Sequence, residues 1–522
     1  MPAETGILFS EWPLSAEAPA DPAPLASIPG GQSVPVAQPR FKVIDRKQTF
    51  LRCVDVEALI DEDHPARAIW NVVEKLDLSA FHEQTRVLEG SAGRSGTNPH
   101  LLVSLWIYAY SQGVGSAREI SRLSGYHPSY QWLTGAEKIS GHTLSSFRVE
   151  HKEALEKLFI EVVGVLSAEG FVNLKRVMQD GTKVRANAAA DSLRRGETLK
   201  QHLEEARQQC AALAQTADDG KKSEVRKQAR KRAAEERVVR LTAAVEQIQQ
   251  LETETRTDDI VRVSSSDPEA RKMKQPDGGF APSYNVQTIT SAKGKAIVSL
   301  DITQAGNDFE QLQPTLDRLE RTLGSKPEQV VVDAGYISQA NILETATAGV
   351  ELIGPVQSPE AKAAQGYTRA GVKPEFYGDQ FRFDAEANCL YCPMEKRLGY
   401  QGKTKSELVV IHKYQARPGD CSACERKVDC CPKNEKTGRS VQRSEYYKEI
   451  QNFQQQMEQP EMKQIYRTRS EVAETPHLWM KAKFKLRQFH VRGLVKVGQE
   501  ALWAALTYNI TLLIRYRKKA IA

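Results

Sequence analysis

Residues 172–190, VNLKRVMQDGTKVRANAAA, decide the fold prediction, because the hydrophobic period of the chain changes here from that of helices to that of strands. The segment predicts a short strand that runs into Asp180, a turn at Gly181 and a second strand through Val184. A β-sheet is therefore expected to begin at this point.

The sheet is expected to continue through four later segments. These are SYNVQTIT (283–290), KAIVSLDIT (295–303), QVVVDAG (329–335) and VELIGPV (350–356). A helix from Phe309 to Leu323 and another from Ser338 separate the last three. Two or three antiparallel strands followed by alternating helices and strands are the order of an RNase H-like core. The predicted fold class is therefore α/β, an RNase H-like mixed sheet flanked by helices, in residues 171–192 and 257–357.

The remaining segments are expected to be helical, disordered or cysteine-rich. Residues 1–40 are rich in Pro, Ala and Gly and predict a disordered leader. Apolar residues at three-to-four spacing predict an all-α domain over 41–170. The charged stretch 193–256 predicts a helical hairpin, and a solvated structural insertion is favoured over a DNA clamp. A Cys-rich insertion (358–445) and C-terminal helices (446–522) complete the chain.

Composition narrows the function only slightly. Lys and Arg number 72 against 66 Asp and Glu, a net charge of +6 that is compatible with a polyanionic partner without identifying one. The most apolar segment, Ala501 to Ile514, is too short for a membrane span and contains Asn509. Without a targeting segment either, the sequence predicts a soluble cytoplasmic protein with no membrane partner.

Two aspartates are candidate metal ligands, because each lies at a predicted strand end beside small residues. Asp180 precedes Gly181, and Asp333 precedes Ala334. Mg²⁺ prefers hard oxygen ligands, so two such carboxylates with a helical glutamate would suit it. A strand-end aspartate also commonly forms a turn or caps a helix, and that alternative stays open for each one alone.

The C-terminal region supplies the glutamate and several cations. Glu474 and Lys481 are seven residues apart, which predicts that they share one face of a helix. Arg469, Arg492 and Lys496 add positive charge where phosphates would lie. An amphipathic surface helix with ordinary ion pairs is the alternative interpretation.

Three segments in order, MQDGTKVRANA (178–188), VVVDAGY (330–336) and YRTRSEVAETPHLWMK (466–481), resemble the three acidic motifs of DDE transposases from bacterial insertion sequences. HPARAIWNVVEKLDL (64–78), LLVSLWIYAYSQGVGSAREI (101–120) and SGHTLSSFR (140–148) resemble the helical domain of the same family. The resemblance extends from about Phe41 to Tyr516.

The resemblance implies a role for each motif residue. The family's two aspartates and its glutamate correspond to Asp180, Asp333 and Glu474, and its Tyr, Arg and Lys correspond to Tyr466, Arg469 and Lys481. Four residues separate Arg469 from Glu474, where many relatives have three, which makes the role of Arg469 less certain than those of the acids. Glu471 is the competing acid, but its distance from Lys481 does not fit the motif.

A DDE transposase is a metal-dependent polynucleotidyl transferase and nuclease. The resemblance implies two Mg²⁺ (or Mn²⁺) ions, about 4 Å apart, that serve hydrolytic cleavage at the element's end and then attack of the freed 3′-hydroxyl on target DNA. It also implies that the helical domain recognises terminal inverted repeats, that the protein assembles as a homo-oligomer on DNA, and that it is associated with the nucleoid. The rivals are a nuclease that cuts without joining and a catalytically dead DNA-binding protein, against which the intact acids argue.

The cysteines suggest a second metal. CLYC and CSAC place pairs in Cys-x-x-Cys spacing at Cys389, Cys392, Cys421 and Cys424, with residues 393–420 between the pairs. Four such thiolates suit one tetrahedral structural zinc ion, and Cys430 or Cys431 could replace one of them. Free reduced thiols are the alternative. Catalytic zinc is not expected, because a closed four-cysteine site leaves no open position.

Overall fold

The computed structural model describes residue 47 and residues 53–82, 96–215, 221–254, 261–355, 371–406, 409–432 and 437–521. The predicted leader, residues 1–40, lies outside the described residues. The chain from Val54 to Ala522 forms one compact unit. Within the described residues, every helix is too short or too polar to cross a lipid bilayer.

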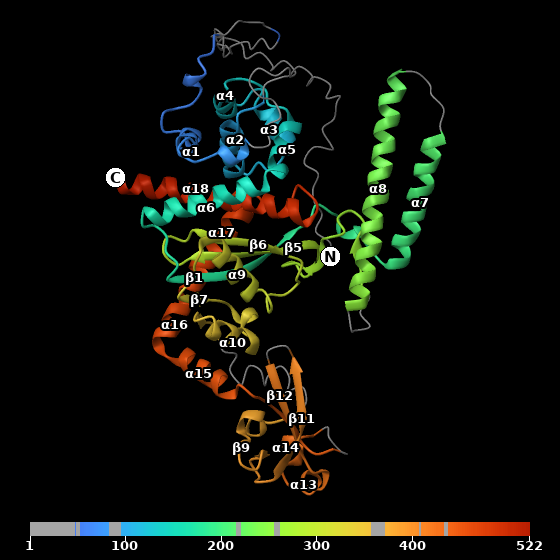
Figure 1. Cartoon of the computed structure of the whole chain (residues 1–522), viewed down its shortest axis with the longest axis vertical. Helices are drawn as coiled ribbons and strands as arrows, with labels where there is room; N and C mark the ends of the chain where they lie inside the picture. The colour runs from blue at the N-terminus through green and yellow to red at the C-terminus, as the bar shows by residue number, and fades with distance from the viewer. Residues whose placement is uncertain are drawn as a thin grey trace, which may run out of the picture. The chain divides into compact units, whose positions relative to one another are not determined.

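The centre of the molecule is a six-stranded mixed sheet (Figure 1). Its strands are β1 (Arg176–Arg185), β4 (Arg271–Lys274), β5 (Phe280–Ser291), β6 (Ile297–Thr303), β7 (Gln329–Val331) and β8 (Glu351–Ile353). Strand β5 pairs antiparallel with β1, β4 and β6, whereas β7 runs parallel to both β1 and β8. The chain therefore has the predicted mixed α/β sheet. Every residue of β5 from Ala281 to Ser291 is buried, so both of its faces are covered.

The predicted turn at Gly181 is wrong, because β1 is one continuous strand in which Gly181 pairs with Gln287. The glycine serves close packing instead of a turn. A Cβ at Gly181 would overlap the amide nitrogen of Gln287 and lie 2.6 Å from an oxygen of Asp308. The absence of a side chain at this position lets polar side chains approach the strand next to Asp180.

Two helices connect the strands in the part of the chain where helices and strands alternate. The helices α9 (Leu312–Leu323) and α10 (Gln339–Thr347) connect β6 to β7 and β7 to β8. Leu312, Leu316 and Leu319 are fully buried at the spacing of one helix face, which holds α9 against the sheet. Farther along the chain, α17 (Arg469–Leu478) contacts β1 and β5.

The N-terminal segment is helical, as its periodicity predicts. Its α-helices are α1 (Pro65–Val73), α2 (Pro99–Ser111), α3 (Ala117–Leu123), α4 (Pro128–Thr134), α5 (Gly141–Glu150) and α6 (Lys152–Ala168). These helices share one hydrophobic core with the sheet, because the C-terminal helix α18 (Leu494–Ile521) contacts α2, α6 and β6. Trp503 of α18 lies within ring-contact distance of Trp106 and Phe147.

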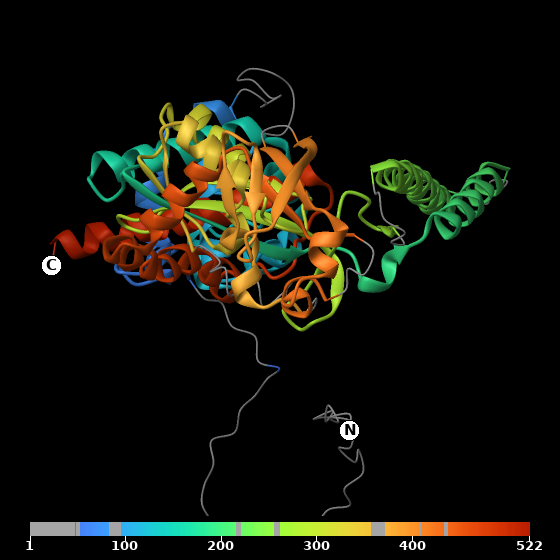
Figure 2. The ribbon, with the colours of Figure 1, turned by 90° about the horizontal axis from the view of Figure 1, so that it is seen from below.

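The charged segment has two long helices, α7 (Gly196–Gln215) and α8 (Lys221–Glu254), that run side by side (Figures 1 and 2). A small apolar core of their own joins them, which includes Leu199, Leu203, Leu241 and Ile248. The short strands β2 (Leu193–Arg194) and β3 (Val263–Ser264) pair at the base of the hairpin.

The cysteine-rich segment has a second, five-stranded antiparallel sheet that the sequence analysis did not predict. Its strands, in the order β13-β12-β11-β10-β9, are β9 (Arg382–Asp384), β10 (Cys389–Tyr391), β11 (Arg397–Ser406), β12 (Val409–Ala416) and β13 (Ser440–Ser444). The helices that follow β12 or β13 are α13 (Pro418–Ser422), α14 (Lys427–Cys430), α15 (Tyr447–Glu458) and α16 (Pro460–Arg467). The last two lead the chain back to α17.

Short 3₁₀ turns and one π-helical turn complete the secondary structure. The 3₁₀ turns are η1 (Glu57–Leu59), η2 (Ser79–Phe81), η3 (Ala190–Ser192), η4 (Ala334–Tyr336), η5 (Pro374–Phe376) and η6 (Gly378–Gln380). The π-helical turn η7 (Trp479–Lys483) follows α17 directly.

Candidate active site

Two neighbouring parallel strands bring Asp180 and Asp333 together. In the register between β1 and β7, Met178 lies beside Val331. Asp180 and Asp333 each follow these partners by two residues, so both lie at the same level and on the same side of their strands. The pairing of the two aspartates thus follows from the strand register.

The guanidinium of Arg469 lies between the two carboxylates. It donates a hydrogen bond to Oδ1 of Asp180 at 3.0 Å and lies 3.5 Å from Oδ2 of Asp333. The Arg469 side chain is 10% exposed and that of Asp180 is 14% exposed, so this ion pair is largely removed from water. Three residues of the predicted site, from three distant parts of the sequence, are therefore in contact.

His477, which the sequence analysis missed, is the second partner of Asp180. Its Nδ1 lies 3.5 Å from Oδ2 of Asp180, and its Nε2 is 2.8 Å from the hydroxyl of Thr288. Burial alone would raise the pKa of Asp180, but interactions with His477 and Arg469 outweigh it and hold this pKa below its ordinary value. His477 lies eight residues after Arg469, and this helical spacing was the available signal.

Asp333 is in a different electrostatic environment. Burial raises the pKa of Asp333, Arg469 opposes this effect, and the nearby charges of Asp180 and Asp308 add to it. Its Oδ1 also accepts a hydrogen bond from the backbone N–H of Gly335 at 2.8 Å, which caps η4. Asp333 is therefore a turn-capping residue as well as a member of the acidic pair.

Asp308, which the sequence analysis missed, is a third acid near the two aspartates. Its Oδ1 accepts hydrogen bonds from the side-chain amides of Asn285 at 2.8 Å and Gln287 at 2.6 Å. Gln287 in turn accepts one from the hydroxyl of the buried Tyr336 at 2.5 Å. This network fixes the polar wall beside the two aspartates. Asp308 lies in a loop without hydrophobic periodicity, so the sequence pattern gave no signal for it.

Glu474 is not part of this contact group. It is exposed and forms no hydrogen bond or ion pair in the part of the chain that the structure describes. Arg469, Ala473 and His477 occupy the buried face of α17, and Glu474 lies beside that face on the solvent side. The competing acid, Glu471, is paired with Lys295.

The other two motif residues lie near the aspartates. Burial lowers the pKa of Lys481, and the charge of Asp180 partly offsets this effect. Burial raises the pKa of Tyr466, with Arg469 opposing and the charges of Asp333 and Asp180 adding to it. Because the π-helical turn follows α17, the seven-residue spacing from Glu474 to Lys481 does not correspond to two regular α-helical turns.

Asp180 and Asp333 have the chemistry of a divalent-cation site. Their carboxylate oxygens are the ligands that Mg²⁺ prefers, and a guanidinium already lies between them, so the site stabilises positive charge. As the side chains stand, no group of three or more His, Cys, Asp or Glu residues in the described ranges converges in the manner of a metal site. The two aspartates fit a metal ion, and Glu474 is not in position as a third ligand.

The predicted DNA-contacting residues Arg492 and Lys496 lie away from this pair. They line a groove of about 670 Å³ between α8 and the loop at Asp267. Arg492 donates from Nε to the backbone carbonyl of Asn187 at 2.8 Å. Burial lowers the pKa of Arg240 in this groove, and the nearby charge of Arg492 lowers it further. The groove therefore contains both guanidinium groups, together with four acids, Glu235, Glu236, Asp267 and Glu269.

The predicted zinc ligands do not share one face of the second sheet. Cys389 and Cys392 are three residues apart around β10, so strand alternation directs them to opposite faces. Leu390, two residues before Cys392, packs into the local core with Cys392 and Cys421, whereas Cys389 shares the other face of β10 with Tyr391.

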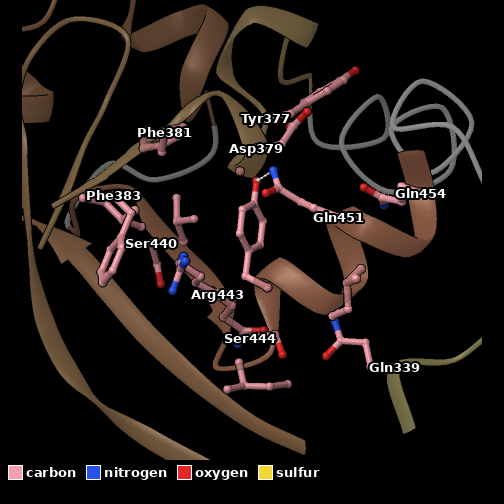
Figure 3. Close-up of a pocket in the computed structure, with 17 residues that line it drawn as sticks. Gln339, Tyr377, Asp379, Phe381, Phe383, Ser440, Arg443, Ser444, Gln451 and Gln454 are labelled. Carbon is pink, nitrogen blue, oxygen red and sulfur yellow. Dashed lines mark hydrogen bonds between the residues drawn. The ribbon is translucent and has the colours of Figure 1, made fainter. Parts of the chain in front are cut away.

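A separate cavity of about 970 Å³ lies between the second sheet and helices α10 and α15 (Figure 3). The Arg443 guanidinium is stacked 4.0 Å from the centre of the Phe383 ring and 4.7 Å from that of Tyr447. Gln451 donates a hydrogen bond to the Tyr447 hydroxyl at 2.9 Å. Neither Asp180 nor Asp333 lines this cavity, so it is distinct from the candidate active site.

Comparisons with known proteins connect this geometry to a family. Residues 258–510 match the family model "Transposase DDE domain", and residues 54–150 match "Transposase domain (DUF772)". The first match includes Asp333 and Glu474, and Asp180 precedes it. No curated protein matches the chain significantly. A piggyBac transposase synaptic complex with hairpin DNA aligns at 7% identity and a TM-score of 0.30, over 87% of this chain and 75% of that one.

Proposed function

Since the chain belongs to the DDE transposases through both of its matched domains, we propose that it cuts DNA at the ends of an insertion sequence and joins them to target DNA. The observation that carries this proposal is the pairing of Asp180 with Asp333 across neighbouring strands, with Arg469 between them. The strand order, antiparallel strands followed by parallel strands and helices, supports an RNase H-like core for this site.

When bound by Asp180, Asp333 and Glu474, two Mg²⁺ or Mn²⁺ ions supply Lewis-acid chemistry that activates an attacking oxygen and stabilises a leaving one. The chain's own residues prepare the site for this chemistry. Arg469 holds the two carboxylates together despite their repulsion, and the amide network around Asp308 fixes the wall behind them. Lys481, half-buried and close enough to interact with Asp180, would orient DNA phosphates and not transfer protons.

The proposed reaction has two in-line substitutions at phosphorus. In the first, a water oxygen attacks the phosphate at the element's end, and the bond from phosphorus to the 3′ oxygen breaks. In the second, the freed 3′-hydroxyl attacks a target phosphate, and the target's own 3′ oxygen leaves. In both steps the oxygen of an O–H group attacks phosphorus and a 3′ oxygen leaves. One arrangement of residues can therefore serve both steps.

Glu474 must approach the aspartates for this proposal to hold. Its exposed position beside the buried face of α17 supports such a movement, because no contact within the described residues holds its carboxylate elsewhere. Glu471 is paired with Lys295, which makes it the weaker candidate for the third ligand.

DNA recognition is proposed for the N-terminal helices, in the predicted domain 41–170, and for Arg492 and Lys496. The match of residues 54–150 to a transposase domain supports the first assignment. The groove lining supports the second, because four basic side chains that can contact phosphates, Arg232, Arg240, Arg492 and Lys496, line it beside four acids. Cutting two ends in one event implies that the protein acts as a homo-oligomer on the DNA.

The experiment compares Glu474→Gln with its matched control Glu471→Gln, three residues away on the same helix. DNA carrying the sequences that flank the gene is incubated with each protein and Mg²⁺, and cleavage and strand transfer are measured separately. Glu474→Gln should reduce both by on the order of 10³-fold, since a neutral amide in place of a metal ligand forfeits about 4 kcal/mol. Glu471→Gln should retain most activity.

Two results would contradict these expectations. The reverse pattern, in which Glu471→Gln is the inactive variant, would contradict the assignment of Glu474. Cleavage by the wild-type protein without any joining of pre-cut 3′ ends would identify a nuclease and overturn the proposed function.

A further inference from the structure

Five cysteines surround one small cavity in the second sheet. The cavity measures about 20 Å³, and its lining includes Cys392, Cys421, Cys424, Cys430 and Cys431. Cys392 follows β10, Cys421 and Cys430 lie in α13 and α14, and Cys424 and Cys431 come shortly after these helices. Thiolates suit soft and borderline metal ions, and a set of four is typical of structural zinc sites.

Backbone N–H groups already point at two of the sulfurs. Lys396 donates from its backbone nitrogen to Sγ of Cys392 at 3.3 Å, and Arg439 donates in the same way to Sγ of Cys421 at 3.3 Å. Glu395, in the turn after Cys392, has a left-handed backbone conformation with φ of 53°. The tight loop around the sulfur imposes this conformation. These hydrogen bonds fix where the two sulfurs lie at the cavity.

Cys389 is excluded from the cavity, which changes the ligand set that the sequence predicts. It lies on the other face of β10 and is absent from the cavity lining. Cys430 is the better replacement, because it belongs to the small buried core against which Cys392 and Cys421 pack, whereas Cys431 does not. Cys431 neighbours Cys421 and Cys430.

We propose that Cys392, Cys421, Cys424 and Cys430 bind one structural zinc ion. As the side chains stand, the sulfurs line the cavity without converging, so binding requires them to rotate inward and lose their protons. The ion would join the turn after β10 to α13 and α14. A metal ion that cross-links these segments would stabilise the local fold, because the hydrophobic core here is small. Among the described residues it has ten buried members.

The test measures metal content and does not depend on the proposed transposase activity. Full-length protein, freshly purified under reducing conditions, should contain about one zinc per chain by elemental analysis. Cys430→Ser should lose most of it, whereas Cys431→Ser, the adjacent control, and Cys389→Ser should keep it. Circular dichroism checks that each variant is folded.

A second measurement covers the case in which Cys430→Ser does not fold. Wild-type protein reconstituted with Co²⁺ should show the intense near-ultraviolet sulfur-to-metal absorption and visible bands of a tetrahedral site with four thiolates. Absence of zinc from the wild-type protein, absence of these bands, or loss of zinc from Cys389→Ser with retention by Cys430→Ser would overturn the proposal.

Discussion

Replacing Arg469 by Met is expected to destabilise the metal-free protein, because the Arg469 guanidinium pairs with Asp180 and Asp333, which lie far from it in the sequence. Met retains an unbranched apolar stem of similar reach and removes only the charge and its hydrogen bonds. The carboxylate of Asp180, 14% exposed, would lose its direct partner at 3.0 Å, and that of Asp333 would lose its neighbour at 3.5 Å.

The size of the effect follows from burial. Removing one partner of a fully buried ion pair typically costs about 3–5 kcal/mol, whereas an exposed pair is worth about 0–1 kcal/mol. The contact with Asp180 belongs to the first class, although His477 remains near its second oxygen. The contact with Asp333, whose side chain is 40% exposed, belongs closer to the second. Together they give a loss of about 2–4 kcal/mol in the free energy of unfolding.

The assay is urea unfolding in EDTA and in Mg²⁺, with Arg467→Met as the matched control. Arg467 is exposed two residues earlier, so its replacement should change stability by less than about 0.5 kcal/mol. Mg²⁺ should stabilise Arg469→Met by about 2.7 kcal/mol at 100 times its dissociation constant for this variant, and it should stabilise the wild type less, because there the cation competes with a guanidinium. Arg469→Met as stable as the wild type in EDTA, or equal stabilisation of both proteins by Mg²⁺, would refute the reasoning.

Two further predictions concern residues beside this contact. The raised pKa of Asp333 means that its contribution to stability is fully present below the unfolded pKa near 3.8 and is lost as pH rises through the folded value. Asp333→Asn should therefore be more stable than the wild type at pH 7 in EDTA, with the difference vanishing below about pH 4, and a constant difference in a pH series of unfolding curves would contradict this. Gly181→Ala should cost about 1–3 kcal/mol, because its methyl group would displace the amide of Gln287 and an oxygen of Asp308, and an unchanged thermal midpoint would show that the wall is not tightly packed.

The sequence predicts that the two aspartates come from neighbouring strands, and Asp333 does follow the end of β7, but the strand end expected at Asp180 is wrong, because β1 continues to Arg185. A short apolar run that ends at Asp180 and another that ends at Asp333 are local patterns, and the β1 to β7 register follows from parallel pairing. The same locality explains the confirmed helical character of the N-terminal segment.

The predictions that were wrong, and the site residues that were missed, depend on contacts between segments that are far apart in the sequence. Gly181 has the sequence signature of a turn, and only its closeness to Gln287 explains why the strand continues through it. Asp308 joins the site through tertiary packing alone, and the helical spacing of His477 from Arg469 does not by itself place His477 beside Asp180. The Cys-x-x-Cys spacing at Cys389 is regular, but strand alternation, which depends on β10 being a strand, separates it from the cysteine cluster.

The contact of α18 with the N-terminal helices has a consequence for the synthesis of the protein on the ribosome. The apolar helix α2 is buried on nearly all sides, and part of its cover is α18, which begins at Leu494. About 350 residues must be translated after α6 before α18 is complete (521 minus 168), which takes about 18–70 s at typical elongation rates. During this interval the nascent chain displays Trp106 and its neighbours without their final partner, so chaperone demand should be highest before α18 has been translated.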